Sequence, residues 1–201
     1  MSTAGLGFDF KKDPYDNFLD LFREAQVKGI PEVNAMALAT VSSDNKPSVR
    51  IVLYKGLVRG GLSFYTNYDG RKARDIEANK NIAATFFWPH LDRQIRFEGT
   101  ATKLTREESE NYFSTRNRLS QLGAWSSNQS EKIESFSELQ KKVSEINRKF
   151  QGQAVTCPPY WGGYRIDASE IEFWLGREGR LHERYVYQRE KSDWIRFLRS
   201  P

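Results

Sequence analysis

The sequence predicts a mainly β protein: an antiparallel barrel or sheet with helices at its periphery. Its apolar and aromatic residues fall mostly in short runs separated by turn-forming residues, and helical patterns interrupt these runs at only a few places. Strands and helices do not alternate regularly, and the chain lacks a GxGxxG motif, so a Rossmann fold is disfavoured. A length of 201 residues fits a single domain.

The first half of the chain begins with a helix and continues with strands. Asp13 can cap a helix over 14–28, Pro14 suits its first position, and Gly29 can end it. Polar residues at 42–47 predict a turn. The apolar runs around this turn predict strands at 35–41, 48–55, 62–67, 82–88 and 94–104, with a short helix at 71–79.

The second half of the chain has two helices followed by strands. Thr105 and Glu108 form a capping box that opens a helix ending near residue 116. Ser135 and Glu138 repeat this pattern and predict a helix at 135–150, after a polar stretch. The tail predicts strands at 164–166, 171–175, 180–189 and 194–198, with a hairpin turn at 190–193.

Composition excludes several classes of protein. No run approaches the roughly 18 apolar residues of a membrane span, and the N-terminus does not resemble a secretory signal, so we expect a soluble, cytoplasmic protein without a membrane partner. The single cysteine, Cys157, excludes an intramolecular disulfide and a cysteine-cluster metal site. With only His90 and His182 as histidines, a metal centre is not expected.

Three explanations fit the basic net charge of the chain. The chain carries 31 Lys and Arg against 26 Asp and Glu, a net charge of +5. Nucleic-acid binding is one explanation, a mildly basic surface is another, and a site for phosphorylated small molecules is the third. Because no block of five or six like charges occurs, the last two readings are favoured, and no nucleic-acid partner is expected.

One short pattern near the C-terminus could bind an anion. Arg180, His182 and Arg184 alternate within the strand predicted at 180–189 and would project from one face, with Trp174 on the neighbouring strand as a flat surface for a ring. This pattern also occurs on ordinary solvated strand faces.

Two further groups suit phosphates. Tyr112, Arg116 and Ser120 are spaced by four, so they would share a helix face if the helix continues. Arg71 and Lys72 open a predicted helix, where cations are unfavourable unless an anion is bound. Either group can also be an ordinary exposed surface.

Five motifs occur in the order seen in pyridoxamine 5′-phosphate oxidases, which the chain resembles from about residue 31 to 189. They are RIVLYKG, FYTNYDGRKARDIEANKNIAATFFWPHLDRQIRFEG, YFSTRNRLSQLGAWSSNQS, YWGGYRI and IEFWLGREGRLHERYVYQRE. Each motif is short, but five in register are highly specific.

The resemblance implies an FMN-binding split β-barrel, antiparallel and Greek-key-like, that works as a homodimer with FMN at the subunit interface. It implies oxidation of pyridoxamine 5′-phosphate or pyridoxine 5′-phosphate to pyridoxal 5′-phosphate in vitamin B6 salvage. Electrons would pass to O2, giving H2O2, and the amine would release NH3. The single domain would divide into an N-terminal segment and helix (1–30), a barrel core with helical insertions (31–160), and C-terminal dimerisation and active-site strands (161–201).

Carried over by resemblance, the site residues form three groups. The catalytic residues would be Arg180 and His182. Cofactor contacts would come from Arg50, Ile51, Val52, Leu53, Tyr54, Lys55, Tyr65, Thr66, Arg71, Lys72, Gln94, Gln129, Ser130, Trp174 and Arg184. Substrate contacts would come from Lys55, Tyr112, Arg116, Ser120, Arg180 and His182.

The chain departs from the family at both ends. Residues 1–12 lack the Arg and Tyr that fold over the substrate in the family, and the chain ends in WIRFLRSP instead of Arg-Leu-x-Pro. Two alternative functions stay open: a sister flavoenzyme that acts on a phenazine-type substrate, and a non-catalytic protein that binds flavin or pyridoxal phosphate.

Overall fold

The computed structural model describes residues 8–201. Of the segment 1–12, which lacks the Arg and Tyr of the family's lid, residues 1–7 lie outside this range. The helices are α1 (Pro14–Val27), α2 (Arg71–Ala78), η1 (Pro89–Leu91), α3 (Arg106–Ser114), α4 (Arg118–Ser126), α5 (Phe136–Lys149) and η2 (Glu178–Arg180). The strands are β1 (Ala35–Val41), β2 (Pro47–Leu53), β3 (Leu57–Val58), β4 (Gly61–Asn67), β5 (Asn81–Trp88), β6 (Arg93–Lys103), β7 (Trp161–Leu175), β8 (Glu183–Glu190) and β9 (Asp193–Leu198).

The strands form one antiparallel nine-stranded sheet with the order β2-β1-β5-β6-β7-β4-β3, and β8 and β9 extend it from β7. Non-consecutive strands are neighbours at β1–β5 and β4–β7, which is the expected Greek-key-like character. The end of β2 returns to β4, where Lys55 N donates to Ser63 O at 2.9 Å, so the sheet curls toward a barrel. The predicted fold class is confirmed.

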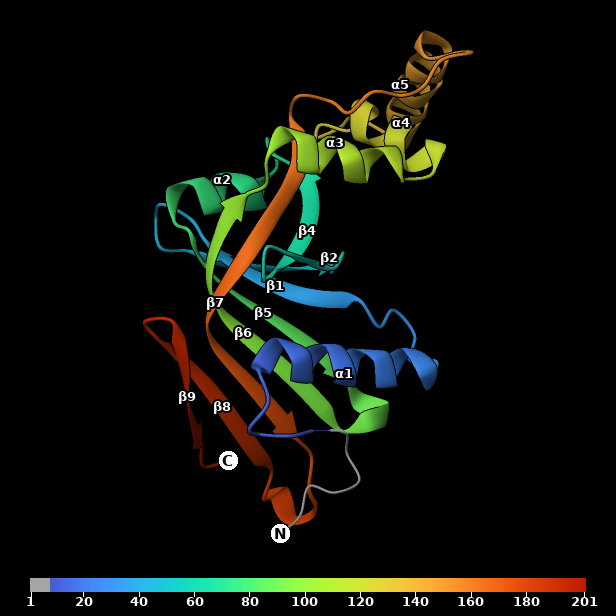
Figure 1. Cartoon of the computed structure of the whole chain (residues 1–201). Helices are drawn as coiled ribbons and strands as arrows, with labels where there is room; N and C mark the ends of the chain where they lie inside the picture. The colour runs from blue at the N-terminus through green and yellow to red at the C-terminus, as the bar shows by residue number, and fades with distance from the viewer. Residues whose placement is uncertain (1–7) are drawn as a thin grey trace.

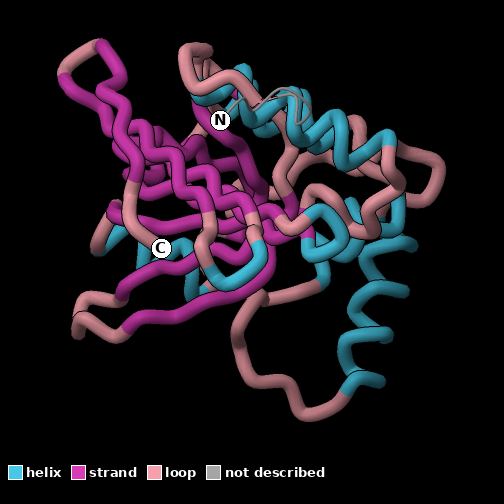
Figure 2. Tube along the Cα trace, turned by 90° about the horizontal axis from the view of Figure 1, so that it is seen from below, coloured by secondary structure: helices cyan, strands magenta, loops and turns pink. Residues whose placement is uncertain are grey.

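Strand β7 pairs with three other strands. It pairs with β6 along its length, but its first part, 161–166, pairs with β4, and its last part, 170–175, pairs with β8. Figure 1 shows the consequence: β7 runs from the end of the molecule that carries α3, α4 and α5 to the end that carries β8 and β9. Viewed from below, the strands gather on one side and most helical turns on the other (Figure 2).

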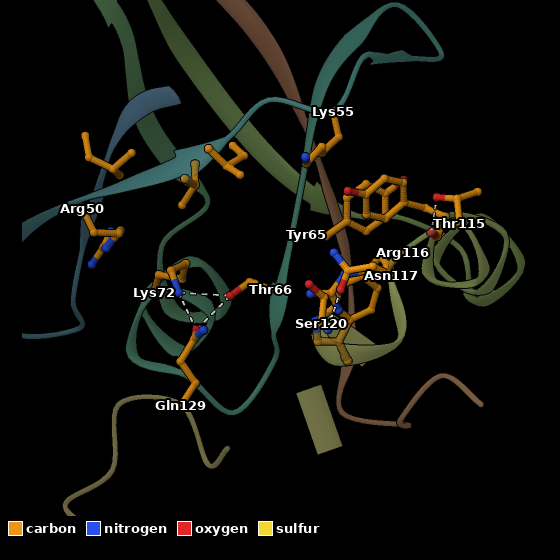
Figure 3. A pocket seen from close by; sticks show the side chains of 15 residues that line it. Arg50, Lys55, Tyr65, Thr66, Lys72, Thr115, Arg116, Asn117, Ser120 and Gln129 are labelled. Atoms are coloured by element: carbon orange, nitrogen blue, oxygen red, sulfur yellow. Dashed lines mark hydrogen bonds between the residues drawn. The ribbon is translucent and has the colours of Figure 1, made fainter. Parts of the chain in front are cut away.

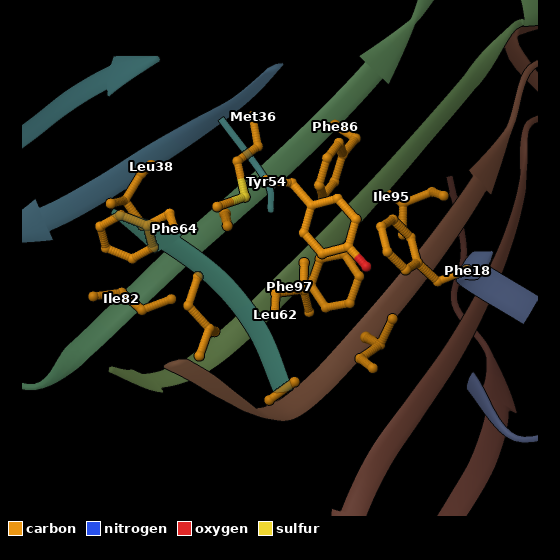
Figure 4. Packing of buried hydrophobic residues seen from close by; sticks show 14 of the residues in the cluster. Phe18, Met36, Leu38, Tyr54, Leu62, Phe64, Ile82, Phe86, Ile95 and Phe97 are labelled. Carbon is orange, nitrogen blue, oxygen red and sulfur yellow. The ribbon is translucent and has the colours of Figure 1, made fainter. Parts of the chain in front are cut away.

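The main core is aromatic and lies between α1 and the sheet. Phe18 of α1 is fully buried, and its ring lies 5.1 Å from Phe86 and 5.2 Å from Phe97 (Figure 4). Asp13 caps α1 by accepting from Tyr15 N, as expected. A second cluster, which includes Phe113, packs the helical end.

Three element predictions are wrong in detail. The helix that begins at Arg106 ends at Ser114, so Ser120 does not share its face. Asn117 caps a separate helix, α4, which contains Ser120. The two tail strands at 164–166 and 171–175 are one strand, β7, with a register shift opposite Glu98 and Gly99. The last long strand, β8, begins at Glu183 and not at residue 180.

Candidate functional site

A cavity of about 550 Å³ opens beside β2 and β4, between the start of α2 and the α3–α4 connection (Figure 3). It brings together many residues that the sequence assigned to cofactor or substrate. They are Arg50, Ile51, Val52, Leu53, Lys55, Tyr65, Thr66, Lys72, Tyr112, Arg116, Ser120 and Gln129. The cavity therefore collects part of the expected cofactor contacts and part of the expected substrate contacts.

One side of the cavity is cationic around Lys72. Its Nζ donates to Thr66 Oγ1 at 3.0 Å and to Gln129 Oε1 (Figure 3). Within residues 8–201, no carboxylate lies within ion-pair distance of this amine. Burial and, to a lesser extent, the charge of Arg50 lower the pKa of Lys72 to about 8. A buried amine with an unbalanced charge is a good partner for an anion.

Arg50 is held at the same side by its neighbours. Its Nη1 donates to Thr40 Oγ1 at 2.7 Å, and its Nη2 lies 3.7 Å from the buried carboxylate of Asp75. Burial lowers the pKa of Arg50, and Asp75 acts against that shift. The guanidinium is therefore fixed in orientation before any ligand arrives.

Helix α2 begins beside Lys72. Its N-cap, Gly70, has no side-chain cap, and an added Cβ there would lie 2.6 Å from Gln129 Oε1. Arg71 N donates to Ser130 Oγ at 3.2 Å. Arg71 and Ser130 do not line the cavity itself, but they lie where the free amides of the helix favour negative charge.

The opposite side of the cavity contains a second unbalanced cation. Arg116 Nη1 is buried, and it has no hydrogen-bond partner in the part of the chain that the structure describes. Its guanidinium lies 4.7 Å from the centre of the Trp161 ring. Burial lowers the pKa of Arg116, as expected for a cation whose partner is missing. Figure 3 shows Lys55 and Ser120 on this side as well.

Aromatic rings form the wall next to Arg116. The Tyr65 and Tyr112 rings stack with centroids 3.8 Å apart, and Trp161 stacks on Tyr65 at 5.5 Å. Burial raises the pKa of Tyr65 to about 12, so its hydroxyl stays protonated and can donate.

Tyr54 is placed in the core. Its side chain is 5% exposed and packs against Phe18 and Phe22, so only its backbone is available to a ligand in the cavity (Figure 4). Burial raises the pKa of Tyr54 to about 12. Tyr54 directly follows β2, and its side chain lies in the core whereas that of Leu53, the last residue of β2, lines the cavity.

The predicted strand face of Arg180, His182 and Arg184 is wrong. Gly179 and Arg180 have φ values of 64° and 62°, in the left-handed region, so the chain turns here instead of extending. His182 precedes β8 and accepts at Nδ1 from Arg177 N at 3.1 Å. Its ring lies 4.5 Å from Trp174.

These residues lie far from the cavity within one chain. Trp161 lines the cavity at the start of β7, and Trp174 lies near the end of that strand, about 40 Å of extended chain away. Gln94, Trp174 and Arg184 are directly opposite one another on β6, β7 and β8. The sequence-assigned site is therefore divided between the two ends of β7. The C-terminal group consists of Gln94, Trp174, Arg180, His182 and Arg184.

Three lining residues were not assigned from the sequence. Thr115 and Asn117 lie in the α3–α4 connection, and Trp161 begins β7. The pattern Asn117-x-x-Ser120 is a helix N-cap signal that could have located the start of α4. Trp161 gave no signal beyond its position before two glycines.

Residues 8–201 lack two other kinds of site or segment. No group of three or more His, Cys, Asp or Glu side chains is arranged to hold a metal ion. No helix in this range is long and apolar enough to cross a membrane.

Comparison with known proteins places the chain in a family. The model described as pyridoxamine 5′-phosphate oxidase matches residues 22–150, more than half of the chain. A second model, the pyridoxine 5′-phosphate oxidase C-terminal dimerisation region, matches residues 161–201. Together they span both groups of site residues.

Relatives and solved structures agree with these matches. Pyridoxine/pyridoxamine 5′-phosphate oxidases from Bdellovibrio bacteriovorus and Rubrobacter xylanophilus are each 51% identical, covering 96% and 100% of this chain and 100% and 93% of theirs. The crystal structure of PhzG from Burkholderia lata 383, in complex with tetrahydrophenazine-1-carboxylic acid, has a TM-score of 0.89 at 28% identity and covers 94% of this chain and 93% of that one. The two family models and the full-length identities lead to one conclusion: this chain belongs to the pyridoxamine 5′-phosphate oxidase family.

Proposed function

We propose that this cavity binds FMN and a phosphorylated B6 vitamer, and that the chain oxidises pyridoxamine 5′-phosphate or pyridoxine 5′-phosphate to pyridoxal 5′-phosphate. The observation that carries the proposal is the pair of unbalanced cations, Lys72 and Arg116, at opposite sides of one cavity. Two phosphate esters, one on the cofactor and one on the substrate, would balance them. Membership of the family identifies FMN as the cofactor.

The residues around Lys72 fit the phosphate of FMN. Lys72 and Arg50 supply charge, Thr66 supplies a hydroxyl, and the N-terminus of α2, where Lys72 lies, favours a negative charge. Gln129 would orient the amine of Lys72 toward the ligand. Bound there, FMN would supply a hydride acceptor for the substrate carbon next to the pyridine ring.

The residues around Arg116 fit the phosphate of the substrate. The free Nη1 of Arg116, the hydroxyls of Ser120 and Tyr112, and the amine of Lys55 all line this side. Their task is to hold the substrate in place, because binding at a phosphate remote from the reacting carbon fixes the orientation of the ring. Arg180 and His182 would hold the ring against the flavin from the other group of site residues.

A second copy of the chain would complete the site. The C-terminal group lies too far along β7 to reach the cavity of its own chain, so it would serve the cavity of a partner. The matched dimerisation region, 161–201, contains four of its five members. Strand β2, at the edge of the sheet, also leaves Val49, Ile51 and Leu53 exposed, and a partner would cover them. FMN would then lie at the subunit interface.

Oxygen would be the final electron acceptor, with H2O2 as a product and NH3 released from the amine substrate. Oxygen needs no charged subsite, and none is assigned to it here. A cytoplasmic location, expected from the sequence, stays a prediction.

A phenazine-type substrate is the second candidate. The observation in its favour is the structural similarity to PhzG from Burkholderia lata, whose complex holds tetrahydrophenazine-1-carboxylic acid. The cavity argues against it, because a carboxylate ligand would not need the full set of donors around Arg116. The 51% identity to named pyridoxine/pyridoxamine 5′-phosphate oxidases also exceeds the 28% identity to PhzG.

The deciding experiment is anaerobic reduction of the FMN-loaded protein. Pyridoxamine 5′-phosphate should bleach the visible flavin absorption, and readmitted oxygen should restore it. Unphosphorylated pyridoxamine is the matched control and should bleach the flavin far more slowly. Flavin that stays oxidised with the phosphate esters would contradict the proposed reaction, and bleaching by a dihydrophenazine carboxylate alone would favour the second candidate.

A further inference from the structure

A buried carboxylate lies on the same sheet face as the C-terminal group of site residues. Glu172 of β7 is 2% exposed and lies directly opposite Arg96 of β6. The next row on this face is Gln94, Trp174 and Arg184, across β6, β7 and β8. Directly opposed residues of antiparallel strands share a face, so Glu172 is the diagonal neighbour of Arg184.

Three guanidinium groups surround Glu172. Arg184 approaches it as a fork, with Nε 3.1 Å from Oε1 and Nη2 2.7 Å from Oε2. Arg199 Nη1 donates to Oε2 at 2.9 Å, and Arg96 Nη1 lies 3.6 Å from Oε1. Arg199 also forms two bonds to Glu170, at 2.8 and 2.9 Å. Such close pairing is what a buried charge requires.

The fork determines which donors of Arg184 remain for a ligand. A guanidinium has five N–H groups in one plane. Glu172 takes one from Nε and one from Nη2, and the carbonyl of Ser200 takes one from Nη1 at 3.0 Å. One N–H remains on each terminal nitrogen, in a plane that the protein has already fixed. The Arg184 side chain is 21% exposed, so these donors can reach a ligand.

The end of the chain is tied to the same network. Arg199 N donates to Arg184 O at 3.0 Å, so the last residues follow β8. The side chain of Arg199 then returns to Glu172 and Glu170. Arg199, directly after β9, thus binds the carboxylate that binds Arg184.

We propose that Glu172 is a positioning residue of the flavin site, acting through Arg184, and that Arg199 holds Glu172 in place from the segment that follows β9. The inference rests on the proposed function, because that function takes Arg184 as a flavin contact. Glu172 itself is too buried to touch the cofactor. Its substitution should therefore change FMN binding only while Arg184 is present.

A double-mutant cycle on FMN affinity tests this dependence. The dissociation constant is measured by titrating the apoprotein with FMN and following the quenching of flavin fluorescence. Glu172→Gln should weaken FMN binding by about tenfold, because a charge-assisted fork is lost. In the Arg184→Ala background, the same change should have no further effect. Glu98→Gln is the matched control: it removes an exposed partner of Arg96 and should leave FMN affinity unchanged.

A second variant tests the inference without removing the buried charge. Arg199→Gln, near the exposed end of the chain, should weaken FMN binding by about threefold, again only while Arg184 is present, and Arg199→Lys should restore part of the loss. If Glu172→Gln does not fold by circular dichroism, the Arg199 variants decide alone.

Several outcomes would overturn the inference. Unchanged affinity in both variants would do so, as would effects that add fully to that of Arg184→Ala. If Arg184→Ala itself binds FMN as tightly as wild type, the inference fails together with the assignment of Arg184. The proposed function is judged separately, by whether the wild-type protein oxidises pyridoxamine 5′-phosphate.

Discussion

Single side chains carry the chemistry of the cavity, and two of them are partly buried cations that have no balancing carboxylate within residues 8–201. Lys72 and Arg116 lie on different elements and face the cavity from opposite sides (Figure 3). Burying a charge costs free energy unless a partner compensates it. Each cation therefore predicts an anionic partner, and the two can be tested one at a time.

Arg116→Ala should raise the KM for pyridoxamine 5′-phosphate by about 10- to 150-fold, because a charge-assisted bond of roughly 1.5–3 kcal/mol is lost. Binding of the substrate phosphate stabilises the ground state and the transition state equally, so kcat should change little. Steady-state kinetics on the phosphate ester and on free pyridoxamine measure the effect, and the variant should discriminate less between them. Arg23→Ala, on an exposed face of α1, is the control. An unaltered KM would show that the substrate phosphate binds elsewhere.

FMN affinity should fall as the pH rises through about 8, because that is the pKa to which burial lowers Lys72 in the free protein. A bound phosphate stabilises the charged amine and raises its pKa, so binding takes up a proton. The Lys72 contribution is complete below pH 8 and is lost above it. Titrations with FMN between pH 7 and 9 measure this slope. The Lys72→Met variant should bind FMN more weakly and should lose this pH dependence of FMN affinity. The Lys80→Met variant, changed at an exposed site, should keep the pH dependence. A slope that survives in Lys72→Met would assign it to another group.

At the scale of elements, the sequence predicts what local patterns determine. Strand β1 has the predicted bounds, and the caps at Asp13, Thr105 and Ser135 begin helices as expected. Errors occur where the backbone departs from a regular pattern. Left-handed φ values at 179 and 180 end the extended chain before β8, and alternation alone could not show this.

Asn117 controls the break between α3 and α4. Its side chain accepts from Ser120 N at 2.8 Å, which starts α4 and places Arg116 between the two helices. Asn117→Ala should lose about 0.5–2 kcal/mol of stability and raise the KM for the phosphate ester, because Arg116 and Ser120 lose their fixed spacing. Asn117→Ser keeps a capping oxygen and should restore most of both. Thermal melts and steady-state kinetics make the comparison. Equal KM values for the two variants would show that the cap does not position these residues.

At the scale of the whole molecule, the family resemblance predicted more of the site than local patterns did. The cavity gathers twelve of the cofactor and substrate residues assigned from that resemblance, drawn from β2, β4, α2 and the α3–α4 region. Spacing alone connected only residues within a few positions of one another, such as Tyr112, Arg116 and Ser120. The separation between Trp161 and Trp174 along β7 depends on how β4 and β8 share that strand, and no pattern in the sequence predicts this sharing.

That separation predicts that the protein must pair to bind FMN. Val49, on the edge strand β2, is 68% exposed and does not line the cavity, so it can be changed without touching a ligand. Val49→Asp should place an uncompensated charge in the interface, shift the protein toward monomers, and weaken FMN retention in proportion. Sedimentation velocity at micromolar concentration, with detection at the flavin band, reports both properties together. Val27→Asp adds the same charge at a site that is 83% exposed on α1 and should leave a flavin-loaded dimer. A wild-type monomer that retains flavin would show that one chain completes the site by itself, which the length of β7 argues against.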